Sequence, residues 1–142
     1  MKTIMQKFLL GVAGLFGATA TLADFDGSDA LICSFAQIIE CDYGAECVSV
    51  TNESIDAPDF VQLDFKKKTF VATTAGVDTA PDDIDNVQAL ENHLIAQGVQ
   101  GTNRTDPLGW SISINQTTGR AVLAAAGDNA AFVVFGACMP RK

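Results

Sequence analysis

The sequence predicts an all-β fold, a small antiparallel meander that forms a closed or partly open β-barrel stapled by two disulfides. Short apolar or alternating segments are separated by turn residues at intervals typical of small barrels. Four cysteines, an even number, follow an export-type leader, which favours two disulfides in an oxidising compartment. No internal repeat is visible in the 142 residues, so we expect a single core.

Residues 1–23 are typical of a secretory signal peptide. Two lysines precede an apolar run, and small and hydroxyl residues follow it. The run is about ten residues long, too short for the ~30 Å hydrocarbon core, so a retained anchor is the weaker interpretation. We predict cleavage after Ala23, with Ala20 as the second choice. The product is a single β domain over residues 24–142, periplasmic or secreted from a bacterium and free of the membrane.

Loss of the leader leaves a strongly acidic domain. The chain has 17 Asp and Glu and 9 Lys and Arg; the leader takes Lys2 and Lys7 and no acid, so 17 acids face 7 bases, a formal charge of −10. This field repels nucleic acids and anionic lipids and attracts basic proteins. The acids are scattered along the chain, so solvated loop charge is the simpler interpretation.

The four cysteines allow three pairings. We expect Cys41 to pair with Cys47 across a short loop, and Cys33 with Cys138, because the first and last strands of a barrel are neighbours. Closing the longer loop would remove roughly 4 to 5 kcal/mol of unfolded-state entropy, against about 2 kcal/mol for the shorter one. A zinc site is the alternative, but no Cys-x-x-Cys spacing occurs, so neither metal nor cofactor is expected.

The first half of the domain contains two predicted strand pairs. Residues 31–40, rich in β-formers, end at a turn signal, and residues 47–50 form a short second strand. Thr51 can cap one short helical turn within the connection 51–58. Residues 60–73 alternate as a hairpin with three lysines at its tip, which are usually solvated but could dock an anion.

The second half is predicted to be a meander. Residues 76–86 have the composition of a loop, and residues 87–100 are assigned to a strand around 94–99, although propensity alone would allow a helix. The remaining elements are a loop at 101–108, a strand at 109–114 with Trp110, Ile112 and Ile114 inward, a turn at 115–119, a strand at 120–126, a turn at 127–129 and a strand at 130–138.

Catalytic patterns are lacking in this sequence. His93 is the only histidine; Glu91 would share its strand face, but a structural role is favoured. No nucleophile elbow, phosphate loop or dinucleotide fingerprint is present. The adjacent Asp82 and Asp83 have no apolar pocket implied around them. We therefore do not expect an enzyme.

A binding surface is the more promising expectation. Tyr43 in the small disulfide loop, Trp110, and loop acids such as Asp82 and Asp83 could rim one open end of a barrel, and Lys67 marks the basic hairpin tip. Trp110 is more often a core residue. The three function hypotheses, in order, are docking of a basic protein on the acidic surface, carriage of a small apolar ligand inside the barrel, and weak hydrolysis by His93. A monomer is expected.

Short segments across nearly all of the domain carry a resemblance: Cys33-Ser34, Ile39-Glu40-Cys41, Gln97-Gly98-Val99-Gln100, Gly109-Trp110-Ser111, Thr118-Gly119-Arg120 and residues 132–138. They resemble a family of small secreted proteobacterial proteins with no assigned activity. This implies bacterial export and a compact domain, and no catalytic residue. More loosely, the build is similar to disulfide-closed periplasmic barrels that inhibit lysozyme, whose inhibitory loop motifs are not found here.

Overall fold

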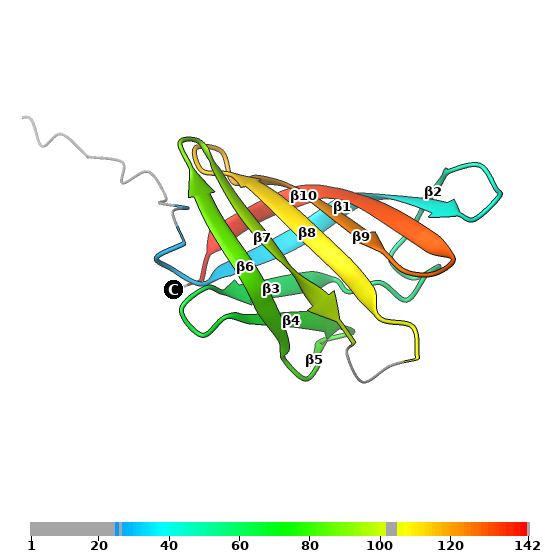
Figure 1. Ribbon diagram of the computed structural model, residues 1–142, viewed down its shortest axis with the longest axis horizontal. Helices are drawn as coiled ribbons and strands as arrows, with labels where there is room; N and C mark the ends of the chain where they lie inside the picture. Colours follow the sequence, from blue (N-terminus) through cyan, green and yellow to red (C-terminus); the bar gives the residue numbers. More distant parts are fainter. Residues whose placement is uncertain (1–24, 26, 102–104, 142) are drawn as a thin grey trace, which may run out of the picture.

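The part of the chain that the structure describes contains ten β-strands (Figure 1). The computed structural model describes residues 25, 27–101 and 105–141; the predicted leader lies outside them. The strands are β1 (Leu31–Asp42), β2 (Val48–Val50), β3 (Phe60–Asp64), β4 (Thr69–Thr74), β5 (Val77–Asp78), β6 (Asp82–Leu90), β7 (His93–Gln100), β8 (Leu108–Asn115), β9 (Arg120–Ala126) and β10 (Ala130–Pro140). The described residues contain no helix long and apolar enough to cross a membrane.

Eight of these strands close into an antiparallel barrel, which confirms the predicted fold class. Their order around the barrel is β1, β3, β4, β6, β7, β8, β9 and β10, and β10 pairs with β1 to complete the circle. Strand β2 extends the pairing of β1 beyond β3, and β5 pairs with the end of β4. Pairing of the last strand with the first removes the open edges that a flat meander would expose.

The two ends of the barrel differ. We call the end with the β3–β4, β6–β7 and β8–β9 connections the closed end, because Phe25 covers it. The Phe25 side chain is 5 % exposed, and a Cβ added to Gly119 would lie only 2.9 Å from its ring. We call the opposite end the mouth. It carries the β1–β2, β2–β3, β4–β5, β5–β6, β7–β8 and β9–β10 connections.

Alternation along the strands fills the interior. In β8 the predicted inward residues Trp110, Ile112 and Ile114 are all buried, and the residues between them are more exposed. Toward the closed end, large aliphatic side chains from neighbouring strands leave almost no exposed surface: Leu31, Leu63, Leu94 and Ile114. This half of the barrel is a packed hydrophobic core.

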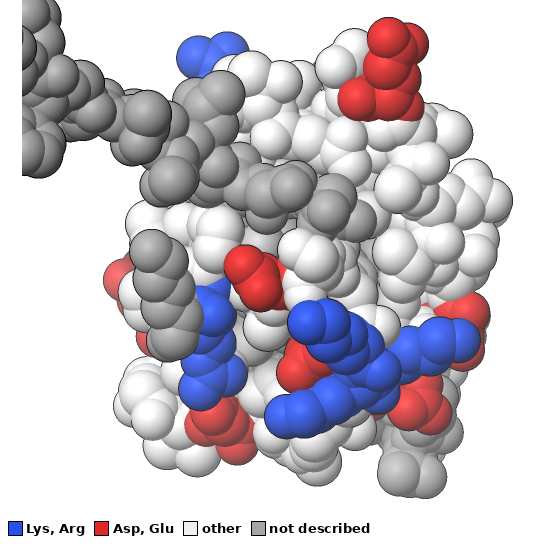
Figure 2. Space-filling view, turned by 90° about the vertical axis from the view of Figure 1, so that its left-hand side faces the viewer, with Lys and Arg blue, Asp and Glu red and all other residues white. Residues whose placement is uncertain are grey.

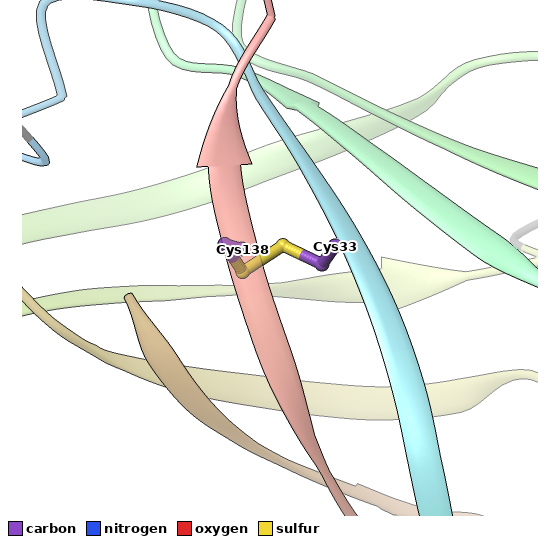
Figure 3. Close-up of a disulfide and its surroundings, with 2 residues drawn as sticks. All are labelled: Cys33 and Cys138. Carbon is purple, nitrogen blue, oxygen red and sulfur yellow. A yellow bond between two sulfur atoms is a disulfide. The ribbon is translucent and has the colours of Figure 1, made fainter. Parts of the chain in front are cut away.

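Both predicted disulfides are confirmed. Cys33 and Cys138 lie directly opposite each other in the β1–β10 ladder and form the long disulfide, with a sequence separation of 105 (Figure 3). Cys41 and Cys47 form the short disulfide, with a separation of 6, at the turn end of the β1–β2 hairpin, next to the Glu40–Val48 pair. The described residues have no free cysteine. Two disulfides are consistent with an oxidising compartment.

The loop predicted over residues 76–86 is wrong. The structure places β5 and the first half of β6 there. The acids that suggested a loop flank Ile84, which is 2 % exposed and belongs to the core, while Asp83 and Asp85 face outward. A single buried residue among exposed acids is enough for a barrel strand but gives a weak alternating pattern.

Strand β7 confirms the strand expected around residues 94–99, but residues 87–90 belong to the preceding strand. Strand β6 continues to Leu90, the chain turns at residues 91–92, and β7 begins at His93. Glu91 is therefore in a turn rather than on the strand face of His93, which corrects the pair suggested by their spacing. The helix that propensity would allow does not form.

Candidate functional site

The interior of the barrel is hollow toward the mouth. A cavity of about 290 Å³ lies there, on the mouth side of the packed core. Most of its lining is apolar, and the lining residues with polar side chains are Asp56, Gln100 and Trp110. The lining residues are Phe35, Ile38, Ile55, Asp56, Ala57, Pro58, Val61, Phe70, Gln100, Leu108, Trp110, Leu123, Ala125, Phe132 and Val134.

A β-bulge in β1 supplies two of the large lining residues. The register with β10 shifts between Phe35 and Gln37, so Ala36 is the extra residue. In an unbroken strand Phe35 and Ile38 would point to opposite faces, because side chains alternate with a period of two. The bulge places both on the inside, where both line the cavity.

Small residues on both neighbouring strands make room for Trp110. Its partner in β7 is Gly98, and its partner in β9 is Ala125. A Cβ added to Gly98 would lie 2.8 Å from Cζ2 of the Trp110 indole, so the ring lies directly over the glycine. The indole therefore forms one wall of the cavity.

The Trp110 ring is held by a second aromatic residue. Its ring centroid lies 4.7 Å from that of Phe70, with the planes inclined at 33°. The side chain is 5 % exposed, and its Nε1 is buried with no acceptor among the described residues. An unpaired buried donor costs about 1 to 3 kcal/mol. The cavity wall thus contains a polar group that packing alone does not satisfy.

The connection 51–58 forms another wall of the cavity through residues 55–58. The helical turn expected here is a series of hydrogen-bonded turns, although the Thr51 hydroxyl does accept from the Ser54 N–H at 3.2 Å. The Asn52 side chain donates to the Pro58 carbonyl at 2.9 Å and fixes the far end of the segment. Asp56 has a positive φ of 53°, a conformation that aspartate tolerates better than most residues.

Charge is distributed unequally between the two ends. All described lysines and arginines belong to the closed end: Lys66, Lys67, Lys68, Arg120 and Arg141. Figure 2 shows this end, where the basic side chains gather with a few carboxylates among them. The mouth and its projecting β1–β2 hairpin have no described base and ten described acids: Glu40, Asp42, Glu46, Glu53, Asp56, Asp59, Asp78, Asp82, Asp106 and Asp128.

The residues predicted as one binding surface do not come together. Tyr43 is 90 % exposed in the β1–β2 connection, whereas Trp110 is buried inside the barrel. Asp82 accepts a hydrogen bond from the Gly101 N–H at 3.1 Å near the mouth, and Asp83 faces outward on β6. Lys67 lies at the opposite end of the barrel. Trp110 alone of these residues lines the cavity.

Lys67, at the tip of the β3–β4 hairpin, interacts with Asp64 of the same hairpin. The Lys67 backbone N–H donates to Asp64 Oδ1 at 2.9 Å, and its Nζ lies 3.5 Å from Asp64 Oδ2. The backbone hydrogen bond is the main reason that the pKa of Asp64 lies below its ordinary value, with the Lys67 charge adding to it. This tip is stabilised as a turn.

Neither a metal-binding cluster nor a similar protein indicates what this cavity binds. Within the part of the chain that the structure describes, no group of three or more His, Cys, Asp and Glu side chains could hold a metal ion. Comparison with protein-family models, with curated proteins and with solved structures gave no match to this chain.

Proposed function

We propose that this protein is a non-catalytic binding protein, exported to the periplasm or secreted by a bacterium, that holds a small and largely apolar ligand inside its barrel. The observation that carries the proposal is the cavity of about 290 Å³ with its apolar lining. An engineered apolar cavity of about 150 Å³ already binds benzene. The space available therefore suits one or two small rings or a short alkyl chain.

Two further features support a ligand site. The cavity has several aromatic walls and few polar groups, which is the usual composition of small-molecule sites. The unpaired Nε1 of Trp110 indicates that this wall is not optimised for stability alone. His93, the only histidine, is exposed at the closed end, away from the cavity, and so offers no base to it.

Trp110 is the only tryptophan in the chain, so its fluorescence reports on the cavity directly. We expect 1-octanol to change that fluorescence saturably in the disulfide-bonded protein. Ala125→Leu fills part of the cavity and should weaken binding about tenfold or more. The matched control is Ala124→Leu, one residue earlier on the exposed outer face of β9, which should leave binding within about twofold. Equal effects of the two variants would refute a site inside the barrel.

A second candidate function is docking of a basic protein at the mouth. The segregation of acids to that end favours it, as does the projecting β1–β2 hairpin with Tyr43 90 % exposed and Val48 54 % exposed. Immobilised protein challenged at low salt with a panel of cationic proteins tests this function. Retention of none of them would end the hypothesis, and retention lost on substituting Tyr43 would support it.

A further inference from the structure

The charge and chemistry around the cavity indicate a more specific ligand. Resting on the ligand-binding role proposed above, we propose that the occupant is a small organic cation. Its apolar body lies in the cavity and its ammonium-type headgroup lies at the carboxylate of Asp56.

Among the described residues that line the cavity, Asp56 alone is acidic or basic. Its carboxylate is exposed and has no hydrogen-bond or ion-pair partner among the described residues. The other described carboxylates nearest in sequence, Glu53 and Asp59, bring more negative charge to the same connection. The negative charge of Asp56 is therefore not neutralised by any described residue, and a bound cation would neutralise it.

No described base competes for that position. The five described lysines and arginines are at the closed end, beyond the packed half of the barrel. A surface charge is screened over about 8 Å at physiological ionic strength, so distant bases contribute little at the mouth. The ten described acids at the mouth instead create a negative potential that attracts cations and repels carboxylate, sulfate or phosphate ligands.

The aromatic lining suits a cation as well as an apolar body. Four aromatic rings face the cavity, from Phe35, Phe70, Trp110 and Phe132. The faces of aromatic rings attract ammonium groups, and cages of such rings recognise quaternary ammonium ligands. The rings and the Asp56 carboxylate together provide contacts for both parts of one amphipathic molecule.

The test compares three ligands that share one apolar chain: octyltrimethylammonium, 1-octanol and octyl sulfate. Each is titrated into the disulfide-bonded protein in 20 mM salt, and binding is followed by Trp110 fluorescence and by calorimetry. We expect the cation to bind about five- to tenfold more tightly than 1-octanol, and octyl sulfate to bind more weakly than either. The preference for the cation should shrink in 200 mM salt.

Asp56→Asn assigns the preference to one residue. Asparagine accepts the positive φ at this position, so the variant should fold. The ratio of its affinity for octyltrimethylammonium to its affinity for 1-octanol should be about fivefold smaller than in the parent. Glu91→Gln is the matched control: it removes the same charge from an exposed turn at the closed end and should leave the preference within about twofold.

The outcomes separate the two proposals. Saturable binding of 1-octanol without any preference for the cation would overturn the cationic ligand and leave the apolar site standing. Equal losses of preference in Asp56→Asn and Glu91→Gln would overturn the role of Asp56. Absence of binding by all three compounds would overturn both proposals.

Discussion

Replacement of Gly98 by alanine should damage both the barrel and its cavity. The new Cβ would lie 2.6 Å from the Asp83 carbonyl oxygen and 2.8 Å from Cζ2 of Trp110. Relief of the first contact requires β6 and β7 to separate, because the carbonyl is part of the β6 backbone, and relief of the second requires the indole to shift into the cavity. Overpacking of this kind costs about 1 to 3 kcal/mol. At about 4 °C per kcal/mol for a domain of this size, the melting temperature should fall by about 4 to 12 °C.

Gly109→Ala is the matched control, because Gly109 lies beside Trp110 in β8 and its nearest neighbour would be 3.9 Å from the new Cβ. Alanine is intrinsically better than glycine in a strand by about 0.5 to 1 kcal/mol, so this variant should be as stable as the parent or slightly more so. Thermal unfolding and near-ultraviolet circular dichroism, which reports the Trp110 environment, are measured for both. Equal stability of the two variants with an unchanged Trp110 signal would refute the packing described for Gly98.

Three further outcomes concern stability. Alanine in place of both cysteines of the long disulfide should cost about 4 to 5 kcal/mol in urea unfolding, against about 2 kcal/mol for the short disulfide; the reverse order would contradict the loop-entropy argument. Phe25→Ala should cost about 3 to 5 kcal/mol because Phe25 covers the closed end, whereas Phe60→Ala, at a side chain 44 % exposed, should cost much less. Asp64→Asn should lower the urea midpoint at pH 7 but not at pH 2. The pKa of Asp64 is lower in the folded than in the unfolded protein, so its ionised carboxylate stabilises the fold above the unfolded-state pKa of about 4. That stabilisation is lost as the pH falls through the folded-state pKa.

The predicted parts of the fold are those with strong local signals. The alternation from Trp110 to Ile114 indicated both a strand and its inward face, and the cysteine arithmetic with barrel topology indicated the disulfides. Strand β6 was missed because its core contribution is concentrated in Ile84, and its exposed acids resemble loop composition. Burial in a barrel depends on neighbours that a local pattern does not reveal.

The cavity was less predictable than the fold. Its presence depends on the bulge at Ala36 and on Gly98 and Ala125 facing the same indole from two strands. Small residues in a strand, such as Ala125 in β9, are a usable sequence signal of space inside a barrel. The lining by residues 55–58 could not be anticipated, since a loop contributes to a cavity only through tertiary contacts.

The division of the barrel into a packed half and a hollow half explains how it can keep a cavity open. The long disulfide joins β1 to β10 on the packed side, where Phe25 and the fully buried leucines also lie, so the strands are fixed relative to one another there. Toward the mouth the same strands continue, but Gly98 and Ala125 flank the Trp110 indole and residues 55–58 close one side, and the side chains there leave a space. Collapse of the cavity would require these strands to bend toward each other against the packed half, which low compressibility of a close-packed interior opposes. A ligand entering such a preformed site loses little free energy to reorganisation of the protein, so even a small apolar body can bind measurably.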